Sequence, residues 1–113
     1  MEININGNIF KVKTVFSQKD VMNGMMNKDF DSSFDAMLFM MKQSEHCFWM
    51  KNCIVPLDII FIQDDEIIKI YHNCPPCLTE DCVNYCSTGN YILEVKGGTC
   101  KNLDIEEGDF IDF

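Results

Sequence analysis

The most marked absence from this 113-residue chain is arginine. All nine basic side chains are lysines, and eighteen aspartates and glutamates outnumber them, so the formal net charge is −9. Nucleic-acid binding depends on clustered cations that neutralise phosphates, and arginine is the usual reader of base edges. The composition therefore excludes nucleic acid as a partner. The same shortage of positive charge argues against attachment to a surface of anionic lipids.

Long hydrophobic runs are also missing. No segment reaches the roughly 18 apolar residues of a membrane-spanning helix. Glu2, Lys11 and Lys13 interrupt the N-terminal region, where a secretory leader would carry a continuous apolar block. These absences predict no membrane insertion and a cytoplasmic or otherwise intracellular location. No linker or low-complexity block is evident, so we expect residues 1–113 to form a single domain.

The chain does contain many short segments of β type. Leu57–Ile62 is an apolar run, and a polar turn at Gln63–Asp65 leads into a second β-rich run, Glu66–Tyr71. This pattern predicts an antiparallel hairpin. Asn6-Gly7, between two further β-rich runs, predicts another hairpin near the N-terminus.

One short helix is predicted from Ser17 to Lys28. Ser17 followed three residues later by Asp20 resembles a capping box, and several apolar residues, three of them methionines, follow at helical spacing. Methionines on one face can act as thioether metal ligands, but flexible filling of a core is their commoner role. We therefore interpret this face as part of the core.

The remaining segments complete a mainly β fold with closely spaced turns. The pattern predicts a compact antiparallel sandwich or partly closed barrel, with the helix covering one end. Lys42–Glu45 is expected to be a turn and Asn73–Asn90 a long loop. The other expected strands are Ala36–Met41, Cys47–Asn52, Tyr91–Lys96 and Phe110–Phe113, and the expected core residues are Trp49, Ile59, Phe61, Ile68, Ile70, Leu93 and Val95.

Several motifs, taken in order, resemble the domain of unknown function 192 family. The clearest is FWMKN at Phe48–Asn52, followed by Pro-Leu-Asp at Pro56–Asp58. The flanking motifs VMNGMM, AMLFMM, PPC and LEVKGG fall in family order, and the resemblance extends roughly from Val15 to the C-terminus. It implies a small β-rich domain. It implies no activity, because the family is named for having none assigned.

Trp49, Lys51, Asn52 and Asp58 form the first candidate site. An aromatic ring, a cation, an amide and a carboxylate on one rim would suit a small-ligand pocket, or base chemistry by a lysine whose pKa is lowered. Glu94 and Tyr85 could lie near them. The alternative is structural: Lys51 and Asp58 pair only to fix the chain around Pro56, with Trp49 in the core.

The second candidate is the cysteine series Cys74, Cys77, Cys82 and Cys86. Four thiolates at this spacing could hold zinc, but Pro75 and Pro76 remove two backbone donors from the first turn of such a site. Two nested bridges, Cys77 to Cys82 and Cys74 to Cys86, are the alternative that we place first, and the family resemblance supports it because PPC and the following cysteine match Cys77 and Cys82. Free thiols remain open, since an intracellular chain is normally reduced. The other three cysteines, Cys47, Cys53 and Cys100, are interpreted as small core hydrophobes.

Three functions follow from these sites. The leading hypothesis is a β domain that binds a small molecule or a protein partner through Trp49, Lys51, Asn52 and Asp58. The second is a small enzyme that uses Lys51 and Asp58. The third is an interaction module stabilised by disulfides or zinc; apart from zinc in this third case, no cofactor is expected.

Overall fold

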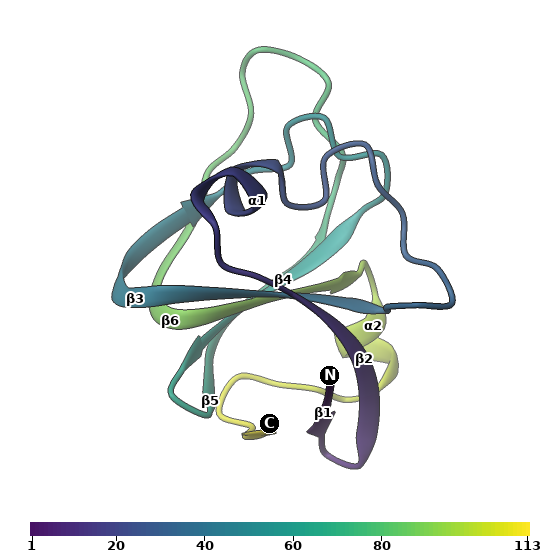
Figure 1. The fold of residues 1–113 in the computed structure, drawn as a ribbon, viewed down its shortest axis with the longest axis vertical. Coiled ribbons are helices and arrows are strands. Elements are labelled where there is room, and N and C mark those ends of the chain that lie inside the picture. Colours follow the sequence, from purple (N-terminus) through teal and green to yellow (C-terminus); the bar gives the residue numbers. More distant parts are fainter.

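The computed structural model describes all of residues 1–113, and its main feature is one seven-stranded sheet that curls into a partly closed barrel (Figure 1). Two short helices accompany the sheet. In chain order the elements are β1 (Glu2–Ile5), β2 (Asn8–Val15), α1 (Gln18–Asn23), β3 (Ala36–Phe48), β4 (Leu57–Gln63), β5 (Glu66–Cys74), β6 (Tyr85–Lys96), α2 (Thr99–Asn102) and β7 (Ile111–Asp112).

The strand order is β5-β4-β6-β3-β2-β1-β7, and every neighbouring pair is antiparallel except β2 with β3. The parallel pair requires a crossover, and this crossover contains α1. The two edges of the sheet meet through the C-terminal segment, where the Ile67 N–H donates to the Asp109 carbonyl at 2.8 Å and the Ile111 N–H donates to the Asp65 carbonyl at 2.7 Å. These bonds bring the sheet close to a closed barrel.

The strand β4, with residues 36–39 of β3 and 92–95 of β6 beside it, is buried on both faces, so alternate residues enter two different cores. One face supplies the barrel core, which contains Leu38, Ile60 and Leu93 together with residues of β1, β2, β5, α2 and β7. The opposite face supplies what we call the outer core, which contains Phe39, Phe61 and Ile92 and is covered by the crossover and by the segment after β3. Leu57–Ile62 has no exposed residue because β4 faces both cores.

The predicted hairpins are present, and their turns explain them. Asn6 at φ 55° and Gly7 at φ 86° join β1 to β2. Asp64 at φ 58° joins β4 to β5. Short polar residues and glycine adopt this left-handed conformation most readily, so both turns are favoured locally.

Three predicted boundaries are wrong. Residues 42–45 are not a turn but part of the long strand β3, whose register with β6 shifts between Met40 and Ser44. Residues 49–52 form no strand, because β3 ends at Phe48. The expected loop Asn73–Asn90 is shorter, since β5 continues to Cys74 and β6 begins at Tyr85. Exposed or half-exposed polar residues concealed the extra length of β3, β5 and β6.

Most of the predicted core is correct, but Trp49 is not part of it. Ile59, Phe61, Ile70, Leu93 and Val95 are buried, whereas Ile68 is half-buried and the Trp49 side chain is 46% exposed. The tryptophan lies just beyond the end of β3, where the chain leaves the sheet. A large ring at this position borders the outer core without entering it.

The helix α1 starts where the sequence predicts and ends earlier. The Ser17 hydroxyl accepts the Asp20 N–H at 3.2 Å, which caps the N-terminus. Gly24 at φ 45° ends the helix after six residues, so Met25 and Met26 lie beyond it. The second helix, α2, was not predicted. No helix is long and apolar enough to cross a membrane.

Candidate functional site

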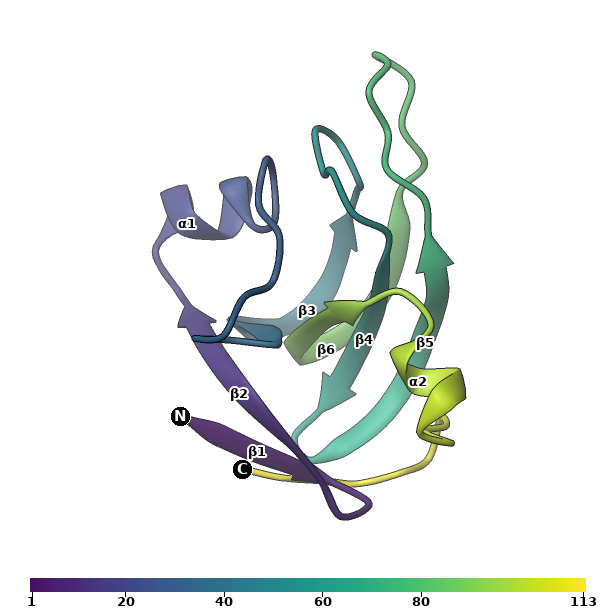
Figure 2. The same cartoon turned by 90° about the vertical axis from the view of Figure 1, so that its right-hand side faces the viewer.

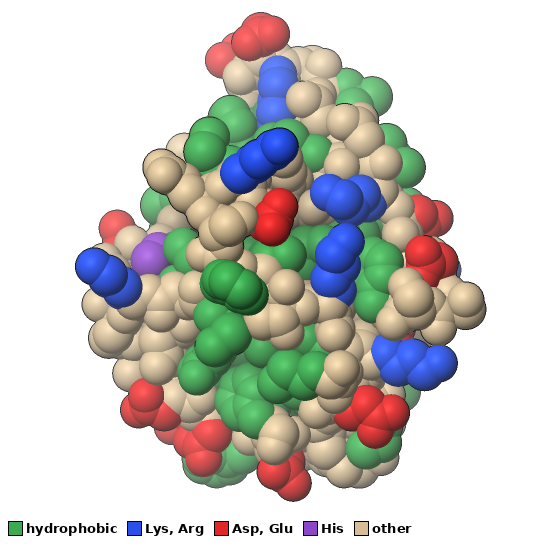
Figure 3. Space-filling model, viewed as in Figure 1, with side chains coloured by type: hydrophobic (Ala, Val, Ile, Leu, Met, Phe, Trp, Pro, Cys, Tyr) green, Lys and Arg blue, Asp and Glu red, His purple; other side chains and the backbone are tan.

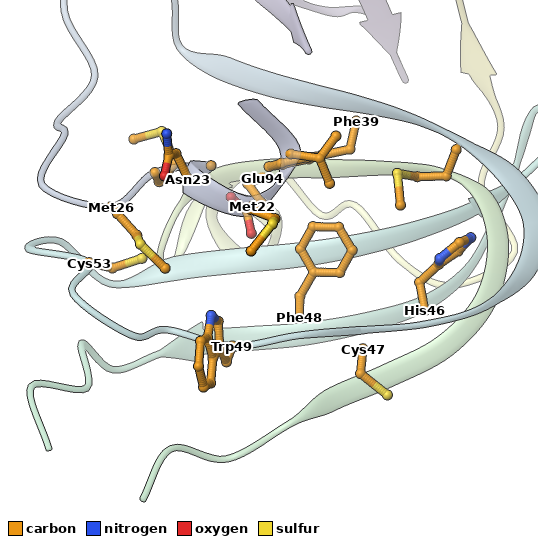
Figure 4. Close-up of a pocket in the computed structure, with 14 residues that line it drawn as sticks. Met22, Asn23, Met26, Phe39, His46, Cys47, Phe48, Trp49, Cys53 and Glu94 are labelled. Carbon is orange, nitrogen blue, oxygen red and sulfur yellow. The ribbon is translucent and has the colours of Figure 1, made fainter. Parts of the chain in front are cut away.

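A cavity of about 280 Å³ opens between the crossover and the outer core (Figures 2 and 4). Figure 2 shows α1 held away from β3 and β6. Residues of the crossover and of the sheet both line the cavity. Most lining residues are hydrophobic. They come from the crossover (Val21, Met22, Asn23, Gly24, Met25 and Met26), from β3 and the residue after it (Phe39, Met41, His46, Cys47, Phe48 and Trp49), and from Cys53 and Glu94.

The crossover is seated on the sheet by contacts that its sequence favours. Met25 is buried in the outer core, and the Met26 backbone forms an isolated bridge with Cys53. Gly24 lies against the ring of Phe39, where an added Cβ would be 3.3 Å from the ring. The Lys28 ammonium group donates to the Gly24 carbonyl at 3.0 Å and closes the end of α1. Because α1 itself has no buried residue, it serves as the lip of the cavity and not as part of the core.

Aromatic rings form the opposite wall. The Phe48 ring contacts Phe39 and Phe61 edge to face, at centroid distances of 4.9 and 6.1 Å. Figure 4 shows Met22, Glu94 and Phe48 near the middle of the site, with Trp49 and Cys53 on one side and His46 on the other. The flexible, polarisable side chain of methionine adapts to ligands of different shape. Rigid rings facing mobile methionines therefore suit the binding of a small apolar molecule.

Glu94 is the polar group of this wall, and it has no partner. It lies in β6, between Met37 of β3 and Ile59 of β4, and its side chain is 3% exposed. No hydrogen bond or ion pair within the protein reaches its carboxyl group, whose oxygens are open to the cavity and are not sealed in the core. Burial raises the pKa of Glu94 to about 8, because the ionised form is poorly solvated there.

The thiol of Cys53 lines the same cavity. Burial, and then the negative charge of Glu94, raise the pKa of Cys53 to about 12, while the cation of Lys28 acts in the opposite direction. Cys53 is therefore a neutral thiol at ordinary pH, and it contributes polarisable surface in place of a reactive thiolate.

Of the four residues proposed from the sequence, the structure places only Trp49 in this cavity. The other three residues make hydrogen bonds that hold nearby backbone segments in place. Lys51 donates to the Thr79 carbonyl at 2.5 Å and lies 3.8 Å from the Glu80 carboxylate, so the expected Lys51–Asp58 pair is wrong. Asn52 adopts φ 58°, and its backbone N–H donates to the Cys77 carbonyl at 2.9 Å.

Asp58 is fully buried and accepts three backbone hydrogen bonds. The Asn73 and Gly98 N–H groups donate to Oδ1 at 2.7 and 3.1 Å, and the Cys100 N–H donates to Oδ2 at 2.8 Å. Gly98 is the N-cap residue of α2 and has no side chain that could cap the helix. Asp58 therefore caps α2 from a distant strand and ties it to the end of β5. The predicted bonds to backbone groups of residues 52–55 are not formed.

The cysteine pairing differs from the nested one. Cys77 and Cys82 form the expected bridge, but Cys86 is bonded to Cys47, and Cys74 is a free buried thiol. Cys47 and Cys86 are directly opposite each other in the β3–β6 register, which explains the bond. Three of the four candidate zinc ligands are thus consumed by disulfides, and no group of three or more His, Cys, Asp or Glu side chains that could hold a metal ion is present. Cys47 is exposed and is not the core residue that was expected, whereas Cys53 and Cys100 are buried.

Sequence reasoning named Glu94 only as a neighbour of the site and did not identify the cavity. Strict alternation in residues 91–96 places Glu94 with Lys96 on the polar face, but that face is buried over most of its length. The signal that could have revealed the cavity is Ile92, an apolar residue two positions before Glu94 on the same strand face. An acidic residue sharing a strand face with a buried isoleucine indicates a carboxyl group beneath covering structure.

A family model for the domain of unknown function 192 (DUF192), described as "Uncharacterized ACR", matches residues 1–113. The chain belongs to this family. Two solved structures share the DUF192 chain's fold. A protein of unknown function from Novosphingobium aromaticivorans has a TM-score of 0.85 at 24% identity, over 99% of this chain and 84% of its own. A protein from Sinorhizobium meliloti, described as a candidate transcription regulator, has a TM-score of 0.84 at 26% identity, over 98% of this chain and 89% of its own. No match was found among curated proteins.

Proposed function

We propose that this DUF192 domain binds a small, mainly apolar molecule in the cavity beneath α1, with Glu94 as its polar anchor. The observation that supports this most strongly is the carboxyl group of Glu94, which is 3% exposed, opens only onto a mainly apolar cavity and has no hydrogen-bond partner in the protein. A carboxyl group held in such poorly solvated surroundings without a partner destabilises a folded protein, so such groups concentrate at functional sites. A ligand that supplies the missing partner removes that cost.

The same geometry does not favour an enzyme built on Lys51 and Asp58. Both oxygens of Asp58 accept backbone N–H groups, and the Lys51 ammonium group is bonded to the Thr79 carbonyl. Neither group is free to take a proton from a substrate. The binding of a small molecule is the better-supported function.

A nucleic-acid role is also disfavoured. The description of the Sinorhizobium meliloti protein as a candidate regulator concerns that protein. In this chain a net charge of −9 with no arginine opposes contact with phosphates. If the domain takes part in regulation, the supported contribution is the recognition of a small ligand.

The two disulfides favour an oxidising compartment over the intracellular location expected from the sequence. Disulfides persist where the surroundings are oxidising and are rare where glutathione keeps thiols reduced. We infer that the domain works in the former kind of environment, and the thiol count described in the Discussion tests the redox state directly.

Binding can be followed by the fluorescence of Trp49, the single tryptophan, which lies at the cavity. Titration with a neutral aromatic probe, 2-phenylethanol, is expected to change its emission and to saturate. Met22→Ala removes apolar contact with the probe and should weaken binding about three- to tenfold, at roughly 0.8 kcal/mol per buried methylene. Met40→Ala is the matched control, because Met40 is also an exposed methionine but does not line the cavity. Equal loss in the two variants, or no saturable signal, contradicts the proposal.

A further inference from the structure

We propose that the ligand of this cavity is a small amphipathic amine, whose ammonium group pairs with Glu94 while its apolar body lies among the rings and methionines. This inference rests on the proposed function and adds the chemical class of the ligand. It starts from the absence of a cation near a carboxyl group that the fold nevertheless buries.

No lysine of the chain neutralises Glu94. The ion pair formed within the protein joins Lys51 to Glu80 in the Cys77–Cys82 loop. Lys28 acts on the neighbouring Cys53 thiol, but its ammonium group donates to the Gly24 carbonyl. The partner of an ionised Glu94 must therefore enter from outside. An ammonium group both donates hydrogen bonds and supplies the opposite charge, and charge-assisted bonds are roughly twice as strong as neutral ones.

The remaining lining also suits a cation better than an anion. Phe48 and Trp49 supply aromatic rings, whose electron-rich faces attract ammonium groups. No lysine lines the cavity, so a ligand carboxylate would meet Glu94 without a compensating charge. Figure 3 shows acidic side chains along the lower edge of this face and lysines over its upper half. The net charge of −9 nevertheless favours cations over anions as ligands of the whole molecule.

The volume limits the size of the ligand. A cavity of roughly 150 Å³ accommodates benzene. About 280 Å³ leaves room for one ring and a short chain, or an alkyl chain of similar bulk. 2-Phenylethylamine is therefore a suitable probe, with 2-phenylethanol as its neutral counterpart and 3-phenylpropanoate as its anionic one.

We expect the binding affinities of the three probes to depend differently on pH. The titratable and charged groups around Glu94 are the thiols of Cys53 and Cys74, together with His46 on the cavity wall and Lys28 at the end of α1. Burial raises the pKa of Cys74 to about 11 and that of Cys53 to about 12, so both thiols stay neutral up to pH 8. The amine binds the ionised form of Glu94, whose pKa is about 8 in the free protein. Its affinity should therefore rise about tenfold or more between pH 6 and pH 8, whereas that of 2-phenylethanol should change little or fall.

The experiment measures the dissociation constants of the three probes at pH 6, 7 and 8, for the wild type and for Glu94→Gln. We expect the amine to bind most tightly at pH 8, and Glu94→Gln to weaken it at least tenfold and to abolish its pH dependence. The loss should be at least threefold larger for the amine than for 2-phenylethanol, which has no charge to pair with Glu94. His46→Gln provides a second check, because loss of the pH dependence there would assign it to the histidine and overturn the inference.

The outcomes separate the two proposals. Saturable binding of 2-phenylethanol that equals or exceeds that of the amine at pH 8, or tightest binding of 3-phenylpropanoate, overturns the amine and leaves a binding cavity. Failure of all three probes to bind overturns the proposed function as well. An amine that binds with equal affinity to wild type and Glu94→Gln shows that the carboxyl group is not its partner, which also refutes the inference.

Discussion

Glu94 and Asp58 are the two buried carboxyl residues of this protein, and their surroundings are opposite. Asp58 accepts three backbone N–H groups, whereas Glu94 accepts none. A buried carboxylate that is fully hydrogen-bonded holds a structure together, while an unpaired one reduces its stability. At the scale of single residues, the first belongs to the scaffold and the second to the site.

The first prediction concerns the stability of Glu94→Gln as a function of pH. The folded pKa of Glu94 is about 8, above the ordinary 4.5 of an exposed glutamate, so the folded state binds the proton more tightly than the unfolded state. Wild-type stability should therefore fall as pH rises from about 4.5 to 8, by up to about 1.4 kcal/mol per pH unit from this group. Glutamine removes that contribution, so urea unfolding should show the variant gaining on the wild type as pH rises. Parallel pH profiles for the two proteins would contradict the assignment.

The second prediction concerns Asp58→Asn. The amide replaces one acceptor oxygen with a donor that faces backbone N–H groups, so at least one buried bond is lost and a repulsive contact is created. We expect a loss of about 2–5 kcal/mol in the free energy of unfolding, measured by chemical denaturation. Asp64→Asn, in an exposed turn, is the matched control and should change stability by less than about 1 kcal/mol. A loss of similar size in both variants would show that the hydrogen bonds of Asp58 do not stabilise the fold more than an exposed turn residue does.

At the scale of elements, the covalent link between β3 and β6 has the clearest energetic consequence. Cys47 and Cys86 are 39 residues apart, against 5 for Cys77 and Cys82. By the chain-entropy relation, removing the longer loop should cost about 4 kcal/mol and removing the shorter about 2 kcal/mol. The double variants Cys47→Ser/Cys86→Ser and Cys77→Ser/Cys82→Ser test this by thermal or urea unfolding. A smaller loss from the first pair than from the second would contradict the ranking.

The elements that could be predicted are those fixed by nearby residues. Asn6-Gly7 and Asp64 determine their hairpins locally, and Ser17 determines where α1 begins. The elements that were missed depend on distant partners. Residues 42–45 extend β3 because β6 continues alongside it, and α2 forms with a cap supplied by Asp58, 40 residues before Gly98.

The candidate site follows the same division. Trp49 was identified, but Lys51 and Asp58 are close in sequence and serve separate parts of the fold, which spacing alone does not reveal. Cys86 was paired with Cys74 because they are near in the chain, while strand register places it opposite Cys47. Glu94 and the crossover are far apart in sequence and line the same cavity only in the folded structure. Its role therefore depends on tertiary structure.

At the scale of the whole molecule, the cysteines give a direct test of the redox state. Two disulfides and three free thiols account for all seven cysteines. Thiol titration of the denatured chain should detect three groups before reduction and seven after it. In the native protein these three, Cys53, Cys74 and Cys100, should react slowly, because burial raises each pKa. Seven reactive thiols in unreduced, denatured protein would remove the support for an oxidising compartment.

The crossover between β2 and β3 carries one side of the cavity, while the curled sheet carries the other. The exposed residues between Ser17 and Asp35 can vary without altering a strand-to-strand register, because the ends of this segment are anchored in the parallel pair and its core residues Met25 and Phe34 hold it on the sheet. Under the proposed function, ligand preference is then modular: grafting the corresponding segment from another member of the family should exchange which molecules are accepted, while the barrel stays the same.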